Sequence, residues 1–455
     1  MARNANQHPK MKNRQEHQRY KDIFLFWLPL EVTWLMMAFE GSFLSAVIAR
    51  LAEAKFNLAA FGVAFAITLF IEAPVLMLVS ASNSLVRDWQ AYIKMRHFSL
   101  GLITVVTVVM GLGLWPPLFY FITRELMGLP ERVAELTHQA SLILIAVPWA
   151  IGYRRFYHGI LIQHGSTWLV AAGTGIRLTA MALTGTWLFF FSPWPGACVG
   201  AWALTTGVVI EALASRLMAK KIIRMLRSGN KASFSTPRVL TYRAISAFYF
   251  PLALTSMLAL GINPVISYFL AQGRMAIESL AVWPVLQALL LIFMSFGLSF
   301  QEVTIALLGD RLENYQKLRR FALGLLFLTV SLFVLFGFSS LSLLWFQQVS
   351  GLTPEMAGFV QKPLQILAPL PALWMALTFQ RSVLVKARRT AIITWATGLD
   401  ILLMGIVLTL GIHYWTMIGV VAAALALVVG RLGSIAFLAR PFSNTILQTH
   451  LPYKS

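Results

Sequence analysis

The chain contains a series of apolar stretches, each long enough to cross a lipid bilayer as a helix. A hydrocarbon core of about 30 Å needs about 20 helical residues. Twelve spans are predicted: 23–48, 58–84, 98–122, 135–161, 167–192, 196–218, 244–271, 278–308, 321–346, 355–383, 390–412 and 415–439. Because a helix satisfies its own backbone hydrogen bonds in lipid, the pattern predicts an all-α polytopic membrane protein.

The composition supports this class and excludes several others. Hydrophobic residues make up 58% of the chain and charged residues 12%, which is too apolar for an ordinary soluble domain. Cys198 is the one cysteine, so neither a disulfide framework nor a thiolate metal site is expected. Residues 1–21 are polar and basic and lead directly into the first span, so no cleaved signal peptide is expected.

The formal net charge of +20 follows the predicted topology instead of indicating nucleic-acid binding. Lysines and arginines gather in alternate connections, at 1–21, 85–97, 216–243, 311–320 and 381–389, and in the tail after 439. The positive-inside rule therefore predicts that both termini are cytoplasmic. The protein is expected in the inner (plasma) membrane.

The predicted domains are a basic cytoplasmic N-terminus (1–22), an N-lobe of six helices (23–218), a C-lobe of six helices (244–439) and a cytoplasmic tail (440–455). The connection 219–243 carries many cations and is expected to lie on anionic lipid headgroups. A monomer is expected.

The two lobes are related by an internal repeat. A constant offset lays Phe26-Trp-Leu-Pro29-Leu30 on Phe248-Tyr-Phe-Pro251-Leu252, and Asp88 on Asp310. A slightly longer offset lays Gly128 on Gly351, Pro148 on Pro371, Thr167 on Thr390, Gly175 on Gly398 and Gly196 on Gly419. Since six is even, the two repeats run parallel, and such folds place the solute path in a central cavity between the halves.

This layout, with a proline early in the first and seventh helices, resembles the MOP superfamily of MATE extruders and lipid-linked oligosaccharide flippases. A closer resemblance is to the progressive ankylosis (ANKH) family. It is carried by Tyr157-His-Gly-Ile-Leu-Ile-Gln-His164-Gly-Ser-Thr167, by Phe250-Pro-Leu-Ala-Leu254 and by Gly297-Leu-Ser-Phe-Gln-Glu302. Weaker similarity extends over most of the chain. The long acidic tail of the animal ankylosis proteins is absent from this sequence.

The ankylosis resemblance implies export of pyrophosphate, nucleotide or citrate-like anions by a secondary transporter. Two other functions stay open: MATE-type efflux of organic cations, and flipping of lipid-linked precursors. The sequence has no Gly-x-x-x-x-Gly-Lys-Ser/Thr loop, so transport is expected to be coupled to Na⁺ or H⁺ and not to ATP hydrolysis. No catalytic residues, metal site or cofactor are predicted, and the chain is not expected to be an enzyme.

Two ion pairs are predicted inside the membrane. Arg177 and Glu211 lie at matching depth in the fifth and sixth helices. Asp400 occupies the repeat position of Arg177, and Arg431 lies three residues before that of Glu211. A structural pair within each bundle is favoured over a proton or ion relay, because removing one partner would leave a buried charge.

Three acidic residues are predicted to face the substrate or coupling cavity. Glu31 and Glu40 are nine residues apart and therefore face opposite sides of a straight helix. Glu31 follows Pro29 by two residues, which is compatible either with a coupling site or with a helix end. Glu72 and Asn83, eleven residues apart, would share a face that lines the path.

The remaining cavity residues are Glu302, Asn263 and Gln287, of which Glu302 is favoured as a gate or coupling residue. Arg154, Arg155 and His158 in the fourth helix could offer a cationic patch to an anionic substrate. Long basic side chains that extend to the interface and set the topology are the alternative.

Overall fold

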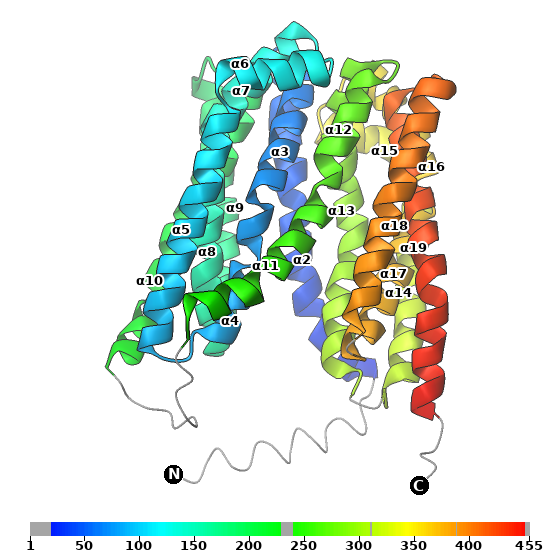
Figure 1. Cartoon of the computed structure of the whole chain (residues 1–455). Coiled ribbons are helices and arrows are strands. Elements are labelled where there is room, and N and C mark those ends of the chain that lie inside the picture. The colour runs from blue at the N-terminus through cyan, green and yellow to red at the C-terminus, as the bar shows by residue number, and fades with distance from the viewer. Residues whose placement is uncertain (1–19, 229–239, 310–311, 388, 451–455) are drawn as a thin grey trace. The chain divides into compact units, whose positions relative to one another are not determined.

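The computed structural model describes residues 20–228, 240–309, 312–387 and 389–450, and these residues form mostly helices (Figure 1). The first half contains α2 (Tyr20–Ala49), α3 (Ala54–Leu76), α4 (Leu78–Leu85), α5 (Trp89–Gly113), α6 (Pro116–Tyr120), η1 (Phe121–Leu126), α7 (Glu131–Leu144), α8 (Ala146–Gln163), α9 (Thr167–Phe191) and α10 (Gly196–Arg227). The second half contains α11 (Tyr242–Leu260), α12 (Ile262–Gln272), α13 (Ala276–Leu307), α14 (Tyr315–Gly337), α15 (Leu341–Leu344), η2 (Trp345–Val349), α16 (Pro354–Ile366), α17 (Leu370–Lys386), α18 (Thr390–Thr409), η3 (Leu410–Tyr414) and α19 (Gly419–His450).

The predicted spans correspond to these helices in order. Within the described residues, ten helices or consecutive helix pairs are long and apolar enough to cross a bilayer. The 25-residue α9 and the consecutive pair α16 and α17 occupy the positions of the two remaining predicted spans. The structure is thus a multi-pass helical membrane protein, consistent with twelve crossings.

The helix bounds reproduce the internal repeat. The offset that lays Asp88 on Asp310 also carries the stretch Ala54–Leu85 onto α13, Ala276–Leu307. The slightly longer offset carries α9 onto α18 and η3, and α10 onto α19. The interruption between α7 and α8 has its counterpart between α16 and α17, so the two halves share local breaks as well as helices.

Backbone conformation supports the same duplication. Gly128 has φ 73° and its counterpart Gly351 has φ 74°. Glu53 has φ 52° and its counterpart Met275, at the shorter offset, has φ 54°. Residues with side chains rarely adopt this left-handed region. A strained turn at the same place in both halves is therefore strong evidence for a true repeat.

Several helix boundaries differ from the prediction. Helix α5 begins at Trp89, nine residues before the predicted residue 98, because the Asp88 side chain accepts a hydrogen bond from the Ala91 amide at 2.8 Å and caps the helix. The basic side chains at 94 and 96 therefore lie in the first turns of α5, not in a connection. Likewise α10 continues to Arg227, and α14 begins at Tyr315 instead of 321.

Contacts between helices divide the chain into two compact units. Unit 1 comprises the described residues of Met1–Ser42, Leu286–Val349 and Thr353–Ser455, and unit 2 comprises Phe43–Val285 and Ser350–Leu352. The predicted N-lobe and C-lobe instead meet at the connection 219–243, of which 229–239 lie outside the described residues. Residues 1–19 of the predicted N-terminus and 451–455 of the predicted tail also lie outside them, and α19 covers 440–450.

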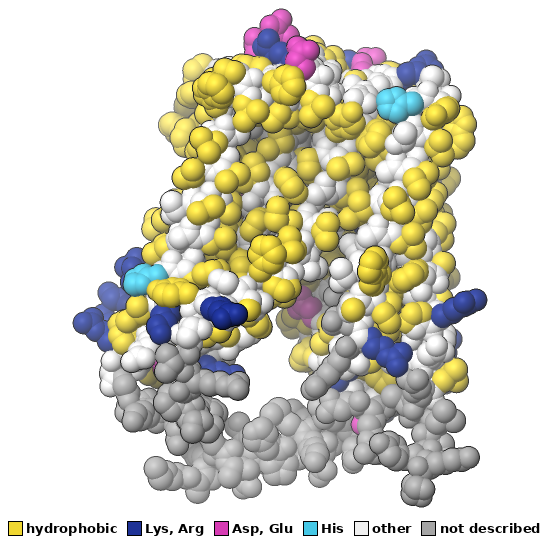
Figure 2. Space-filling model, viewed as in Figure 1, with side chains coloured by type: hydrophobic (Ala, Val, Ile, Leu, Met, Phe, Trp, Pro, Cys, Tyr) yellow, Lys and Arg dark blue, Asp and Glu magenta, His cyan; other side chains and the backbone are white. Residues whose placement is uncertain are grey.

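Each unit exposes many large apolar side chains on the outer faces of its helices. Trp168, Phe191, Phe327 and Trp395 are each at least 70% exposed. In the face shown in Figure 2, hydrophobic side chains cover the middle of the helices, and most charged side chains lie near the ends. This distribution is that of helices surrounded by lipid.

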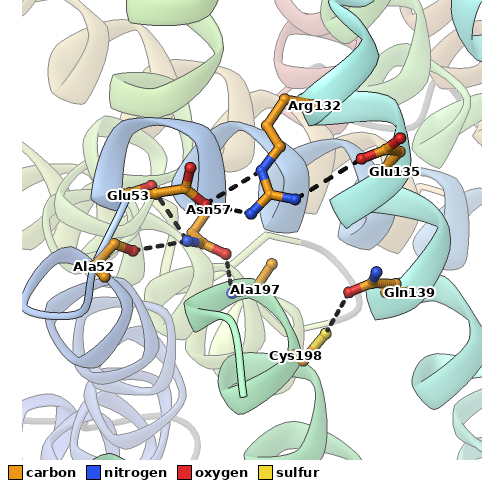
Figure 3. Close-up of polar contacts among 8 residues, drawn as sticks. All are labelled: Ala52, Glu53, Asn57, Arg132, Glu135, Gln139, Ala197 and Cys198. Atoms are coloured by element: carbon orange, nitrogen blue, oxygen red, sulfur yellow. Dashed lines mark hydrogen bonds and ion pairs between the residues drawn. The ribbon is translucent and has the colours of Figure 1, made fainter. Parts of the chain in front are cut away.

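A polar network joins the ends of α3, α7 and α10 in unit 2 (Figure 3). The Asn57 amide nitrogen donates to the Glu53 carbonyl at 3.2 Å, and its oxygen accepts from the Ala197 amide at 2.9 Å. Arg132 donates to the Glu53 carboxylate, from Nε at 3.2 Å. These bonds hold the left-handed Glu53 in the short connection between α2 and α3, so the network fixes this end of the unit.

Candidate functional site

A cluster of charged side chains is buried where α8, α9 and α10 pack together in unit 2. Glu211 on α10 has no exposed surface and forms an ion pair with Arg154 of α8. Arg177 of α9 lies beside the same carboxylate, with Nε 3.4 Å from Oε2. His158, one turn after Arg154, has Nε2 3.0 Å from the Ser215 hydroxyl and 3.8 Å from Glu211 Oε1. The Glu211 carboxylate therefore lies within ion-pair distance of two arginines and faces the His158 imidazole.

Arg155 adds a further positive charge to this cluster. Its charge interacts with those of Arg154, Arg177, Glu211 and Glu72. Its Nε is buried and has no hydrogen-bond partner among the described residues. With three arginines and two glutamates, the cluster carries one net positive charge.

Glycines allow the three helices to approach closely enough for these contacts. A side chain at Gly207 would meet the Arg177 carbonyl oxygen at 2.9 Å, so α10 lies directly on α9 at this point. Gly173 faces the cluster, since its Cβ would lie in ordinary contact with Glu211 at 3.6 Å and with His158 at 3.8 Å. The sequence thus brings the buried charges together through small residues on the facing helices.

Two glycines in the stretch from Tyr157 to Thr167 are required by the structure. Gly159 faces α4, where any side chain would collide with backbone atoms of Val79 and Asn83. Gly165 has φ 72°, a left-handed conformation that ends α8 before α9 begins at Thr167. The motif therefore fixes where α8 lies and where it ends, and so positions His158.

The second half contains a related cluster in unit 1. Asp400 of α18 forms an ion pair with Arg431 of α19, and both side chains are largely buried. Arg381 of α17 donates from Nη2 to the Thr397 hydroxyl at 3.2 Å. The guanidinium carbon of Arg431 lies 4.8 Å from the centre of the Trp374 ring. Both pairs expected from the sequence, Arg177 with Glu211 and Asp400 with Arg431, are therefore present in the structure.

Sequence reasoning missed Arg381, which it counted among the cations of the connection 381–389. The structure places Arg381 inside α17, beside the Asp400–Arg431 pair. The repeat contains a signal that could have found it, since the offset that lays Pro148 on Pro371 also lays His158 on Arg381. Sequence reasoning also did not identify Arg154 as the partner of Glu211, because its pairing considered only the fifth and sixth spans.

A third polar group lies between α2 and α13, also in unit 1. Glu31 is 2% exposed and accepts hydrogen bonds from the hydroxyls of Ser295 and Ser299, at 2.7 and 2.6 Å. Trp27 donates from its indole N–H to the Ser299 hydroxyl at 2.8 Å. Ion pairs of Glu31 with a cationic side chain are absent from the described part of the chain. The buried Glu31 carboxylate thus has two neutral hydroxyl donors, one of which also accepts from the Trp27 indole.

The Gly297–Glu302 stretch contributes directly to this group. Gly297 has no room for a side chain, because the Trp374 ring would lie 2.8 Å from its Cβ. Ser299 contacts Glu31, and Glu302 is exposed and accepts a hydrogen bond from the Trp34 indole at 3.0 Å. The residues that resemble the ankylosis pattern therefore join α13 to α2 and α17.

The remaining predicted residues are not gathered into one site. Glu72 is buried in α3, and Asn83 is exposed in α4, beyond the interruption at Met77. That the two residues share a face lining the path stays a prediction. Glu40 and Gln287 are half-buried in unit 1. Asn263 is half-buried in α12 of unit 2 and donates to the Leu260 carbonyl at 3.3 Å. The structure thus groups Arg154, Arg155, His158, Arg177, Glu211 and Glu72 in unit 2, and Asp400 with Arg431 in unit 1.

Comparisons with known proteins agree with the resemblance drawn from the sequence. The family described as "Progressive ankylosis protein (ANKH)" matches residues 11–182. A search of curated proteins gives no significant match.

Several solved structures of membrane transporters are similar to the chain. An inward-facing multidrug resistance MATE family transporter of the MOP superfamily has a TM-score of 0.69 at 15% identity, over 93% of this chain and 98% of that one. The lipid II flippase MurJ has a TM-score of 0.68 at 16% identity, over 93% and 90%. A MOP superfamily transporter from Pyrococcus furiosus has 0.64 at 15% identity, over 96% and 97%. The chain thus has the fold of the MOP superfamily transporters, and over residues 11–182 it resembles the progressive ankylosis family.

Proposed function

We propose that the chain is an ion-coupled secondary transporter that exports a small multivalent anion, such as pyrophosphate, a nucleotide or a citrate-like acid. The observation that carries this proposal is the excess of buried positive charge in the cluster of Arg154, Arg155 and Arg177 around Glu211. The matched fold is that of transporters, and similar MATE family transporters are known in an inward-facing and in an outward-facing conformation. Alternating access is therefore the proposed mechanism.

The electrostatics of the cluster favour an anion over a cation. A guanidinium in a membrane-spanning segment costs about 2.5 to 3.5 kcal/mol on insertion scales unless a charge or dipole compensates it. Glu211 compensates Arg154 and Arg177, while Arg155 keeps a buried Nε with no acceptor among the described residues. Phosphate and carboxylate groups match the planar donors of arginine and would supply the missing charge.

Glu31 is the proposed coupling residue. Its carboxylate and the Ser295 and Ser299 hydroxyls are oxygen atoms, which either bind Na⁺ or exchange a proton. Protonation or cation binding would each neutralise a buried charge that has no cationic side chain beside it in the described residues. We accordingly propose Na⁺ or H⁺ as the coupling ion, with no other cofactor.

The buried acids support a second candidate function. Glu31 and Glu72 are 2% and 4% exposed, and acidic groups in a membrane bundle can bind an organic cation. This would make the chain an efflux protein of the MATE type, like the multidrug resistance transporter whose fold it shares. A lipid-linked precursor flippase is the third candidate, since the lipid II flippase shares the fold.

We also infer the orientation and location. The cation-rich ends of α5 and α10 and the start of α14 belong to the connections that the positive-inside rule assigns to the cytoplasm. Both termini are accordingly proposed to be cytoplasmic, and the protein to be a monomer of the inner (plasma) membrane. The exposed cations near the end of α10 are proposed to contact anionic headgroups.

Replacing Arg155 by glutamine is expected to lower anion export about tenfold, because one charge-assisted hydrogen bond to an anion contributes about 1.5 kcal/mol or more. Arg155→Lys should retain part of the activity, since it keeps the charge but not the planar donors. The measurement is export of radiolabelled pyrophosphate, citrate and ATP, with ethidium efflux alongside, from cells with equal amounts of each variant in the membrane.

Arg224→Gln provides the matched control, because this exposed arginine lies at the end of α10, away from the cluster. It should export anions like the wild type. Efflux of ethidium without export of any of the three anions would instead establish the cation-efflux function. Unchanged anion export by Arg155→Gln would show that the cluster does not bind the substrate.

A further inference from the structure

The second half of the chain buries two arginines beside a single carboxylate. Asp400 is committed to α19, because Oδ2 pairs with Arg431 and Oδ1 lies against Gly430, where a side chain would collide with it. Among the described residues, Arg381 has no acidic side chain within ion-pair distance. The cluster therefore carries one net positive charge, as the cluster of the first half does.

The uncompensated arginine is held in a defined position. Arg381 Nη2 donates to the Thr397 hydroxyl, and Thr397 donates its own proton to the Ile393 carbonyl at 3.0 Å. Thr397 lies one turn before Asp400 on α18, so Arg381 is kept next to the ion pair. Its charge is close enough to act on Arg431. Two like charges held together in a membrane bundle are costly unless an anion lies between them.

Three N–H groups around this position have no acceptor. They are Nε of Arg381, Nε of Arg431 and Nε1 of Trp374, all buried and all without a hydrogen-bond partner within the described residues. Trp374 and Arg381 are seven residues apart on α17 and therefore share one helix face, and Arg431 lies over the Trp374 ring. Asp400 Oδ1 is also buried and unpaired within the described residues, but it faces Gly430 on α19. Because buried donors are rarely left unpaired in native proteins, the three N–H groups point to a missing acceptor.

Residues at equivalent positions of the repeat differ between this cluster and that of the first half. Arg381 occupies the position of His158, so a guanidinium replaces an imidazole. The position of Glu211 is taken by Ser434, which donates to the Ala396 carbonyl at 2.8 Å. The second half therefore lacks the central carboxylate that neutralises two arginines in the first half.

From this geometry we infer that Arg381, Arg431 and Trp374 form an oxyanion-binding site in the second half of the chain, which takes a phosphate or carboxylate group. The identity of the bound molecule as the exported anion rests on the proposed function. The site itself rests on the three unpaired donors and the uncompensated charge. Asp400 and Thr397 act as positioning residues, one for each arginine.

The test measures binding of ³²P-labelled inorganic pyrophosphate and ¹⁴C-labelled citrate to the full-length protein in phosphatidylcholine nanodiscs. Arg381→Gln should weaken binding at least tenfold, and Arg381→Lys less. Trp374→Phe, which keeps the ring but removes the N–H, should weaken binding about threefold. Arg319→Gln, an exposed arginine of α14 in the same unit, should bind like the wild type.

Normal binding by both Arg381→Gln and Trp374→Phe, with loss of binding in Arg155→Gln, would overturn this site and leave the proposed function standing. Absence of binding to the wild-type protein would overturn both. Trp374→Phe retains every charge, so its binding affinity tests the site even if Arg381→Gln fails to fold. A second arm adds phosphatidylglycerol to the nanodiscs: competition with pyrophosphate identifies a lipid phosphate as an occupant of the site, and no competition identifies a soluble anion.

Discussion

Replacing Glu211 by alanine is expected to destabilise the folded protein by about 3 to 5 kcal/mol, the range observed when one partner of a buried ion pair is removed. Arg154 and Arg177 would both lose their carboxylate, and neither side chain can reach water without leaving the bundle. Fluorescence-detected size-exclusion chromatography and thermal unfolding in detergent measure the loss as reduced yield of monodisperse protein and a lower Tm.

Three further variants test whether the lost stability comes from lost charge compensation, the first of them as a surface control. Glu131→Gln removes an acid whose side chain is 74% exposed, and its Tm should not change. The double variant Arg154→Gln/Glu211→Gln removes the closest pair together and should recover part of the stability lost in Glu211→Gln alone. If Glu211→Ala is as stable as Glu131→Gln, the ion pairs do not hold the bundle together.

Gly159 is expected to tolerate no side chain. A Cβ at this position would lie 2.5 Å from the Val79 carbonyl oxygen and 2.9 Å from the Asn83 amide nitrogen, both backbone atoms of α4 that cannot rotate away. Overpacking of this kind costs about 1 to 3 kcal/mol, and more when backbone must move. Gly159→Ala should lower the Tm, and Gly159→Val should leave little folded protein in the same chromatographic assay.

Other glycines of the same unit provide a graded comparison. Gly101 on α5 has no atom within 4 Å of the place where a Cβ would lie, so Gly101→Ala should be neutral or slightly stabilising, since alanine favours a helix. Gly200 faces the end of the flexible Ile48 side chain at 2.6 Å and should lie between the two. Equal Tm values for alanine at all three positions would show that α8 and α4 are not in backbone contact.

The architecture follows from the sequence because it depends on periodic, local signals. Apolar length predicted twelve spans, a number consistent with the helices, of which ten are long and apolar enough to cross a bilayer within the described residues. The two nearly equal offsets located the duplication that the helix bounds now show. Boundaries were less predictable where polar residues continue a helix beyond the apolar stretch. Helix α5 illustrates this, because its capped first turns carry basic side chains that hydropathy assigns to a loop.

Contacts in the candidate sites could be predicted only where residues lie at the same depth in the membrane or at equivalent positions of the repeat. Matching depth suggested Arg177 with Glu211, the repeat suggested Asp400 with Arg431, and both pairs are in contact. The part played by Arg154 depends on how α8 packs on α10, which no periodicity encodes. Helical spacing also treated Glu72 and Asn83 as parts of one helix, whereas Met77 separates them into α3 and α4.

The boundaries of the compact units fall inside α2 and α13, not at the connection between the repeats. Trp27 and Glu31, from the start of the chain, bond to Ser299 in the second half. Conversely, the Ser256 hydroxyl of α11 donates to the Ala73 carbonyl at 2.7 Å, in the first half. Each half of the sequence repeat thus contributes helical segments to the compact unit formed mainly by the other half. Unit 1 takes α2 up to Ser42 from the first half, whereas unit 2 takes α11, α12 and the start of α13 from the second half. A chain cut at the connection between the repeats would therefore lose contacts of both kinds.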